Sequence, residues 1–192
     1  MGEGLPCLET IKFPSREHEL DGVLARFAAD QPLRHLDLTG FLQVTDEGVR
    51  QIARMTSLRY LSLDGTKVCS TSKNSFLTGH LYRILDYPNL LVGLSKLNTL
   101  SLSCTQVGDA GLCLIGDSEQ TKFTRNLRTL NLSQCRQVSD KGIRGLTGML
   151  NLTNLNLDHT AVSKQCLRHL QDLEWLKPVR LLGVDREEED QD

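Results

Sequence analysis

Aromatic residues, tight cysteine pairs and long apolar runs are all scarce in this chain of 192 residues. Aromatics make up only 5% of it. The six cysteines include no Cys-x-x-Cys pair, which disfavours a zinc site or a disulfide framework and favours reduced thiols. Residues 1–10 lack the basic and apolar segments of a secretory signal, and no apolar stretch reaches eighteen residues. These absences predict an intracellular protein of the cytoplasm or nucleus, with no membrane partner.

Charge is balanced over most of the chain and becomes acidic only at its end. The formal net charge is −2, but residues 185–192 hold six acids and one arginine, so the remainder carries 21 basic and 18 acidic residues. Such a balance gives no reason to expect a nucleic-acid partner. Residues 185–192 are predicted to be a disordered acidic tail. The sequence also lacks a glycine-rich phosphate loop and paired catalytic carboxylates.

Leucine is abundant, with 36 residues, and most of it follows one repeating pattern. A Leu-x-x-Leu-x-Leu triplet returns about every twenty-five residues, as Leu33-Leu36-Leu38, Leu58-Leu61-Leu63, Leu97-Leu100-Leu102, Leu127-Leu130-Leu132 and Leu152-Leu155-Leu157. A period of 20 to 29 residues is typical of a stacked solenoid in which every unit contributes one short strand and one return segment. The pattern predicts an α/β fold that is a right-handed curved superhelix, with parallel strands on its concave face and helices on its convex face.

Degenerate triplets extend the pattern toward both ends. Leu8, Ile11 and Phe13 fit a first strand, and Leu176, Val179 and Leu181 fit a last one. The sequence therefore predicts a single domain of about seven units over residues 1–184. The interval from Leu58 to Leu97 is 39 residues, which indicates an inserted helical segment near residues 69–95. A shorter polar insertion near residues 116–125 is expected to be a loop.

A second motif follows the strand in three units, at residues 44–49, 107–112 and 138–143. Each begins with valine, followed by Thr, Gly or Ser and then by Asp. A glycine lies two residues after the Asp. The Asp or the Ser/Thr before it can accept hydrogen bonds from the first N–H groups of a helix. The glycine lets the helix approach its neighbour closely. These features predict helices that begin near Asp46, Asp109 and Asp140.

Together the two motifs resemble the cysteine-containing class of leucine-rich repeats, a ribonuclease-inhibitor-like solenoid found in F-box/leucine-rich-repeat proteins. The family places a Cys or Thr after each strand, whose polar atom meets backbone groups, and here those positions are Phe41, Thr66, Thr105, Cys135 and Thr160. The resemblance implies a non-catalytic protein-interaction module with a substrate-recognition or adaptor role linked to a ubiquitin ligase. No F-box is recognisable, because Leu8 already fits a repeat strand.

Strand residues between the leucines should point away from the core and form the partner-binding face. This face is polar, with small residues in its middle and arginines, a tyrosine and acids toward its edges, which suits a protein partner better than a small-molecule ligand. Tyr60, Arg34 and Arg59 are the expected anchors. The predicted partner-binding residues are Arg34, His35, Asp37, Arg59, Tyr60, Asp64, Arg128, Asn131, Asn154, Asn156 and Asp158.

Two other hypotheses remain open at this point. The chain can be a structural fragment or short isoform of a larger leucine-rich-repeat scaffold protein. An enzyme or metal site would have to use Cys166 and His169, which lie three residues apart on a predicted helix. The remaining histidines lie in other units and zinc usually needs four ligands, so a buried cysteine beside a surface histidine is the preferred interpretation. The sequence thus predicts no enzyme, no metal and no cofactor.

Overall fold

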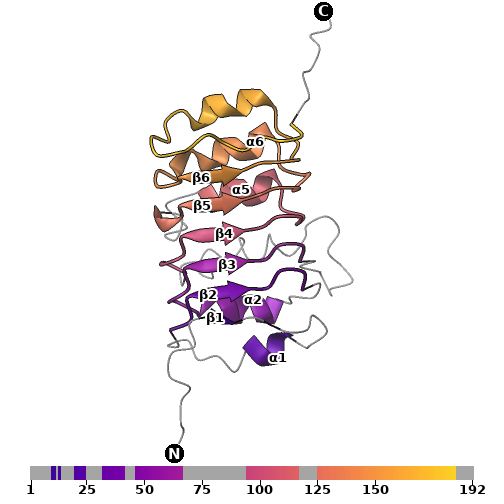
Figure 1. The fold of residues 1–192 in the computed structure, drawn as a ribbon, viewed down its shortest axis with the longest axis vertical. Coiled ribbons are helices and arrows are strands. Elements are labelled where there is room, and N and C mark those ends of the chain that lie inside the picture. Colours follow the sequence, from indigo (N-terminus) through magenta and orange to yellow (C-terminus); the bar gives the residue numbers. More distant parts are fainter. Residues whose placement is uncertain are drawn as a thin grey trace, which may run out of the picture.

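One parallel sheet runs along the whole structure, which is a computed structural model. The structure describes residues 10–11, 13, 20–24, 32–41, 46–66, 94–116 and 125–184. The strands are β1 (Thr10–Ile11), β2 (His35–Asp37), β3 (Tyr60–Ser62), β4 (Thr99–Ser101), β5 (Thr129–Asn131) and β6 (Asn154–Asn156), and they lie side by side in chain order. Figure 1 shows this ladder with α2, α5 and α6 behind it. The predicted α/β solenoid of parallel strands is confirmed.

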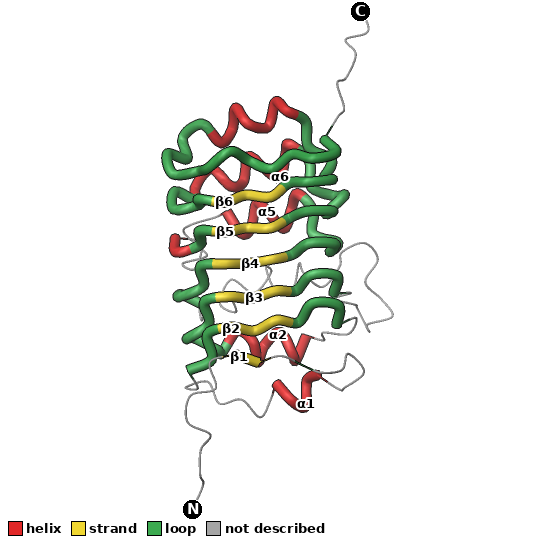
Figure 2. Tube along the Cα trace, viewed as in Figure 1, coloured by secondary structure: helices red, strands yellow, loops and turns green. Residues whose placement is uncertain are grey.

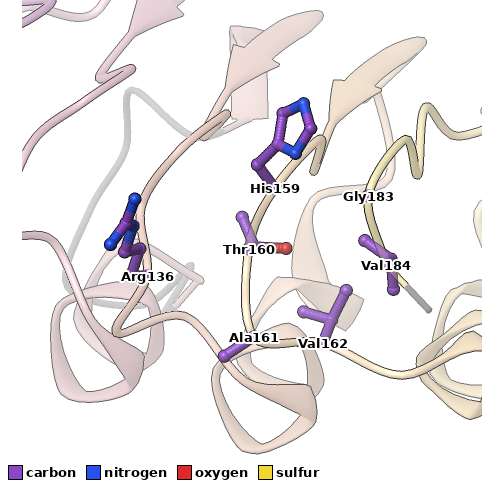
Figure 3. A pocket seen from close by; sticks show the side chains of 7 residues that line it. All are labelled: Arg136, His159, Thr160, Ala161, Val162, Gly183 and Val184. Carbon is purple, nitrogen blue, oxygen red and sulfur yellow. The ribbon is translucent and has the colours of Figure 1, made fainter. Parts of the chain in front are cut away.

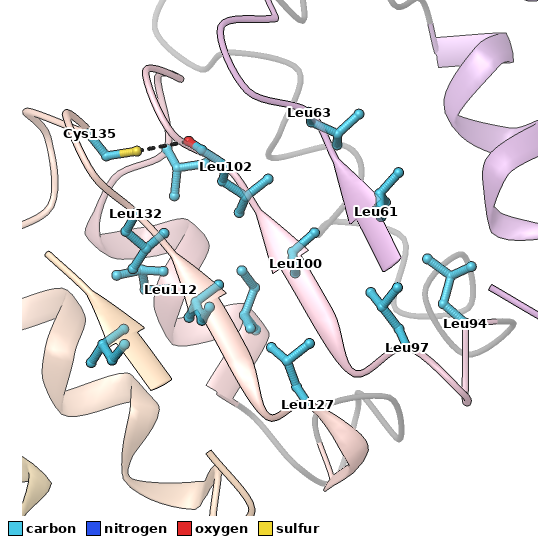
Figure 4. Close-up of a cluster of buried hydrophobic side chains, with 14 of the residues drawn as sticks. Leu61, Leu63, Leu94, Leu97, Leu100, Leu102, Leu112, Leu127, Leu132 and Cys135 are labelled. Carbon is cyan, nitrogen blue, oxygen red and sulfur yellow. Dashed lines mark hydrogen bonds between the residues drawn. The ribbon is translucent and has the colours of Figure 1, made fainter. Parts of the chain in front are cut away.

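The strands pair at the register that the leucine triplets predict. The middle leucines stand opposite one another, with Leu36 against Leu61, Leu61 against Leu100 and Leu130 against Leu155. Every leucine of the five complete triplets is at most 6% exposed. Figure 4 shows such side chains pointing from neighbouring strands into one continuous core. Because side chains alternate along a strand, the residues between the leucines are left on the opposite face, which we call the open face.

Strands β2 to β6 and the bridge at Arg180 are each followed by a turn residue in the left-handed backbone region, a feature that the leucine pattern does not show. These residues occupy one position per unit: Gly40, Gly65, Cys104, Gln134, His159 and Gly183, with φ between 56° and 76°. The backbone N–H of each of the first five donates to a carbonyl in the next unit, as Gln134 does to Asp158 at 2.8 Å. The turn therefore continues the hydrogen-bond ladder beyond the short strands, at a conformational cost wherever the residue is not glycine.

The helices cover the opposite face of the sheet (Figure 2). They are α1 (Leu20–Leu24), α2 (Asp46–Ala53), α5 (Asp109–Gly116) and α6 (Asp140–Ile143). The predicted helix starts at Asp46, Asp109 and Asp140 are confirmed, and Ser139 caps α6 by accepting from Lys141 N. A Cβ on Gly142 would lie 2.6 Å from Oδ1 of Asp109, so the glycine does permit the close approach. Within the last units, however, the return segments include two 3₁₀ helices, η2 (Arg144–Gly148) and η3 (Lys164–Leu170).

The 3₁₀ helices correct the expectation that the convex side is uniformly α-helical. Repeat length does not explain this difference, because 25 residues also separate Leu33 from Leu58 and that unit returns through the α-helix α2. A 3₁₀ helix has three residues per turn and rises about 2.0 Å per residue, against 1.5 Å in an α-helix, so η2 and η3 are narrower than an α-helix. Cys166 and Leu170 on η3 still face the core.

The Cys/Thr position of the repeat behaves as the resemblance implies. Thr66, Thr105 and Thr160 are buried, and each hydroxyl donates to the carbonyl of the last strand leucine of its own unit at 2.7 Å. Cys135 instead donates its thiol to the Leu102 carbonyl of the preceding unit at 3.0 Å, the dashed line in Figure 4. Phe41 has no such donor and packs edge-to-face on Phe13 with ring centroids 5.2 Å apart.

Several sequence predictions lie outside the described residues. These are the helical insertion near 69–95, most of the second insertion near 116–125 and the acidic tail at 185–192. At the last unit, Arg180 forms an isolated parallel bridge with Asn156 in place of a full strand. Its N–H donates to Leu155 O and its carbonyl accepts from Leu157 N, so the ladder continues one step past β6.

Candidate functional site

The open face is built from columns of residues that run across the sheet. Each strand is one rung of the ladder and contributes one residue to each column, at the position set by the parallel register. One column contains Arg34, Arg59, Asn98, Arg128 and Thr153, the next begins with His35 and Tyr60, and a third lies at the carboxyl ends of the strands. Rungs of a sheet are about 4.8 Å apart. The structure therefore brings together the predicted anchors Arg34, Arg59 and Tyr60, while Asn154, Asn156 and Asp158 lie three rungs further along.

His35 and Tyr60 form an aromatic stack on the open face. Their ring centroids are 3.9 Å apart with an interplanar angle of 3°. The Arg34 carbonyl fixes the two rungs by accepting from Arg59 N at 2.8 Å and from Tyr60 N at 2.9 Å. Burial, reinforced by the charges of Asp37 and Asp64 and opposed by hydrogen bonding to Ser62, raises the pKa of the Tyr60 hydroxyl. The stack thus offers a flat, half-buried aromatic platform of the kind that anchors protein partners.

Arginines line the amino-terminal side of this platform. Arg34, Arg59 and Arg128 are all exposed and all belong to one column. Their backbones are locked into the ladder, because the Asn98 carbonyl accepts from Arg128 N at 2.8 Å while Asn98 N donates to the Arg59 carbonyl at 3.0 Å. Guanidinium groups carry several donors in a planar fork and bind carboxylates through paired hydrogen bonds. This column is the basic edge of the open face.

The carboxylates of the opposite edge are engaged within the fold. Asp37 Oδ1 accepts from both the N–H and the hydroxyl of Thr39, at 3.0 and 2.6 Å. Asp64 Oδ1 accepts from Ser101 Oγ at 2.6 Å and from Ser103 N at 2.7 Å. Asp158, only 6% exposed, accepts from Leu182 N at 2.8 Å and pairs with Arg180 at 2.9 Å. These acids hold the strand-end turns together.

Three predicted asparagines also bond inside the repeat. Asn131 accepts from Ser133 N and donates to Ser101 Oγ, at 3.1 and 2.9 Å. Asn156 accepts from Asp158 N at 3.0 Å, and Asn154 donates to Thr129 Oγ1 at 3.3 Å. The side chains of residues 37, 131 and 156 each bond the backbone two residues ahead, which is an Asx-turn. The spacing Asp/Asn-x-Thr/Ser/Asp at each strand end is the sequence signal from which these roles could have been found.

Cys166 and His169 do not form a reactive pair. Cys166 has no exposed surface, and burial together with the nearby charge of Asp140 raises the pKa of its thiol to about 11. His169 accepts a hydrogen bond at Nε2 from Arg144 Nε at 3.2 Å, so this nitrogen is occupied. A thiol with such a pKa is almost entirely protonated at neutral pH and is a poor nucleophile. Among the described residues, no group of three or more His, Cys, Asp and Glu side chains could hold a metal ion.

The thiols should therefore differ sharply in reactivity. Cys104 and Cys113 are exposed, whereas Cys135 and Cys166 are buried and burial raises both of their pKa values. With iodoacetamide at pH 8, followed by peptide mapping, we expect Cys104 and Cys113 to be labelled at least ten times faster. In denaturant the difference should vanish. Labelling of Cys166 at the rate of Cys113 in the native protein would show that its thiol is accessible and would revive the nucleophile hypothesis.

The raised pKa of Cys166 also links stability to pH. The folded state holds the proton more tightly than the unfolded state, in which the thiol has its ordinary pKa near 9. Its contribution to stability is therefore complete below pH 9 and is lost as the pH rises from 9 toward 11.

A shallow pocket at the last turns was not foreseen from the sequence. It has a volume of about 360 Å³ and is lined by Arg136, His159, Thr160, Ala161, Val162, Gly183 and Val184 (Figure 3). The ring of His159 packs against Gly183, where a Cβ would lie 2.2 Å from Nδ1. Val162 and Val184 are buried beneath it. The pocket is polar at its rim and apolar at its base, and it lies away from the stack of His35 and Tyr60.

One comparison with known protein families agrees with the repeat. A family model described as leucine-rich repeat matches residues 93–116 and 125–146. No curated protein matches the chain. Similar solved structures include two internalins from Listeria monocytogenes. The first, inlF, is 19% identical over 77% of this chain and 47% of its own, with a TM-score of 0.43. The second, internalin C2, is 20% identical over 78% of this chain and 80% of its own, with a TM-score of 0.29.

The chain thus spans about half the length of the first of these internalins. The family match covers two neighbouring repeats, and the ladder of parallel strands shows the same repeat register from β2 to β6. Over the part that the structure describes, none of the helices combines the length and apolar character needed to cross a bilayer.

Proposed function

We propose that this leucine-rich-repeat solenoid is a non-catalytic interaction module that holds a partner protein on its open face, centred on β2 and β3. The observation that supports it is the stack of His35 on Tyr60, 3.9 Å apart, with Arg59 exposed beside it. Tyrosine and arginine are the residues most often found at the energetic centre of protein interfaces. The acids and asparagines of the same face form hydrogen bonds with the strand-end turns. They therefore contribute more to the shape of the surface than to the binding energy.

The test compares variants of the full chain in co-purification from cell extract, with quantitative mass spectrometry. Tyr60→Ala and Arg59→Ala are each expected to lower recovery of specific partners at least tenfold, since truncating an interface anchor commonly costs 2 kcal/mol or more. Arg168→Ala, an exposed arginine on η3 at the opposite side, is the matched control and should leave recovery unchanged. Equal recovery with all three variants, each shown to be folded by circular dichroism, would contradict the proposal.

The finer version of this function is an intracellular adaptor or substrate receptor for a ubiquitin ligase. It rests on the resemblance of the Thr/Cys ladder, Thr66, Thr105, Cys135 and Thr160, to the repeats of F-box proteins. Ligase subunits should then be recovered with the wild-type chain, and their recovery should survive Tyr60→Ala if the open face holds the substrate alone. If no ligase subunit is recovered with the wild-type chain, the ubiquitin-ligase role is contradicted, but the proposal of an interaction module is not.

A structural role in a larger repeat array is the second candidate. Trp175 is 67% exposed and Leu182 is 63% exposed at the last described unit, where further repeats could pack. An isolated chain that is monodisperse and melts cooperatively would argue against this role. Aggregation that Trp175→Lys relieves would favour it.

A further inference from the structure

The open face carries its acidic and basic side chains at opposite edges. Its carboxylates lie at the carboxyl ends of the strands and are engaged, Asp64 by Ser101 and Ser103 and Asp158 by Arg180 and Leu182. At the other edge Arg59 and Arg128 are exposed. The column between the two edges is uncharged at Tyr60 and at the residues beside it on β4 and β5, Thr99 and Thr129. A partner approaching this face therefore meets the exposed guanidinium groups of Arg59 and Arg128 along one side, away from the hydrogen-bonded carboxylates.

The spacing of the arginines sets the geometry of that charge. Arg59 and Arg128 are two rungs apart, separated by Asn98, which places their Cα atoms about 9.6 Å from each other. A segment in the extended polyproline II conformation advances about 3.1 Å per residue with three residues per turn, so side chains three residues apart lie on the same side and cover about the same distance. Arg34 lies one rung beyond Arg59 in the same column.

We propose that the partner binds as an extended acidic segment of another protein, laid across the strands, with two Asp or Glu side chains about three residues apart. This inference rests on the proposed function and specifies its partner. One carboxylate lies at Arg59, beside Arg34, and the next lies at Arg128. A flat side chain of the same segment covers the exposed part of Tyr60. Planar guanidinium forks favour carboxylates, which can take two parallel hydrogen bonds from one arginine.

The test is a selection from a displayed library of random twelve-residue peptides on the immobilised full chain. Recovered peptides should be enriched in Asp and Glu, with pairs three residues apart over-represented. By fluorescence anisotropy a labelled peptide from the selection should bind the variant Arg59→Glu/Arg128→Glu at least tenfold more weakly than wild type. The charge-matched control Lys141→Glu/Arg168→Glu reverses two exposed cations on the helix side and should change binding less than twofold at 150 mM NaCl. Affinity should also fall as salt rises.

The possible outcomes distinguish failure of the acidic-segment proposal from failure of the proposed interaction function. Peptides that lose binding with Tyr60→Ala but are not acidic, or tolerate the Arg59/Arg128 reversal, would overturn the acidic partner and keep the interaction module. If no selected peptide depends on Tyr60, Arg59 or Arg128, both ideas fail. Self-association measured by sedimentation, and abolished by the Arg59/Arg128 reversal, would assign the face to a second copy of the chain and also overturn the separate partner.

Discussion

Replacing Gly116 with alanine is expected to lower the free energy of unfolding by about 3 kcal/mol or more. Gly116 ends α5, and a Cβ there would lie 1.5 Å from the carbonyl oxygen of Gly145 and 2.5 Å from its carbonyl carbon. These are backbone atoms of η2, which cannot rotate away as a side chain would. The two helices would have to separate, and overpacking of this kind costs several kcal/mol when the neighbour cannot yield.

Gly22 provides the matched control for this substitution. It lies in α1, and nothing is within 4 Å of the Cβ that alanine would add there. Gly22→Ala should change stability by less than about 1 kcal/mol, in the stabilising direction, because alanine restricts the unfolded chain and favours helix. Urea unfolding followed by circular dichroism measures both variants. Equal midpoints for the two would show that α5 and η2 are not in backbone contact.

Replacing Asp109 with alanine should cost about 3 kcal/mol, although the residue is not in the core. Its carboxylate accepts three hydrogen bonds from the next unit, from Ser139 N at 2.7 Å, Ser139 Oγ at 2.6 Å and Gly142 N at 3.1 Å. Two of these donors are N–H groups at the start of α6, and hydrogen bonds to a charged group contribute about 1.5–3 kcal/mol. Asp109 thus fastens one unit to the next from the helix side.

A graded series tests this role of Asp109. Asp109→Asn keeps one acceptor oxygen but loses the charge, so it should cost roughly half as much as Asp109→Ala. Asp172→Ala, at an exposed carboxylate, should stay within about 0.5 kcal/mol of the wild type. In thermal unfolding the alanine variant should melt about 6–12 °C lower, given roughly 2–4 °C per kcal/mol for a chain of this size. A melting temperature for Asp109→Ala equal to that of Asp172→Ala would contradict the cross-unit link.

Asp140 repeats the same link one unit later, which explains why the motif recurs. It accepts from Ser163 N at 2.7 Å and from Ser163 Oγ at 2.5 Å. The sequence interpretation assigned the helix start to either this Asp or the Ser/Thr before it. In the structure Ser139 and Ser163 cap α6 and η3, while Asp109 and Asp140 bond the following unit. Spacing within one unit could not distinguish these roles, because the partner lies 23 to 33 residues away along the chain.

The open face shows the same limit in its functional residues. Sequence analysis placed Tyr60, Arg59, Asp64 and Asp158 on one face as partner-binding residues, with Tyr60 and Arg59 among the anchors. The hydrogen bonds divide them, since Asp64 and Asp158 bond neighbouring turns while Tyr60 stacks on His35. An acid at a strand end can serve a turn or a partner, and its residue type is the same in both cases. Partner binding by these side chains remains a prediction, which the variants described above test.

What the sequence determined by itself is the repeating core. A leucine triplet returning every twenty-five residues fixes the register of β2 to β6, because a slip by even one residue would expose the buried leucines and bury the polar ones. The tertiary structure alone decided how neighbouring units are joined: the left-handed turns at Cys104, Gln134 and His159, the 3₁₀ returns and the reach of Asp109. These contacts join atoms from different units, so a residue pattern within one unit does not predict them.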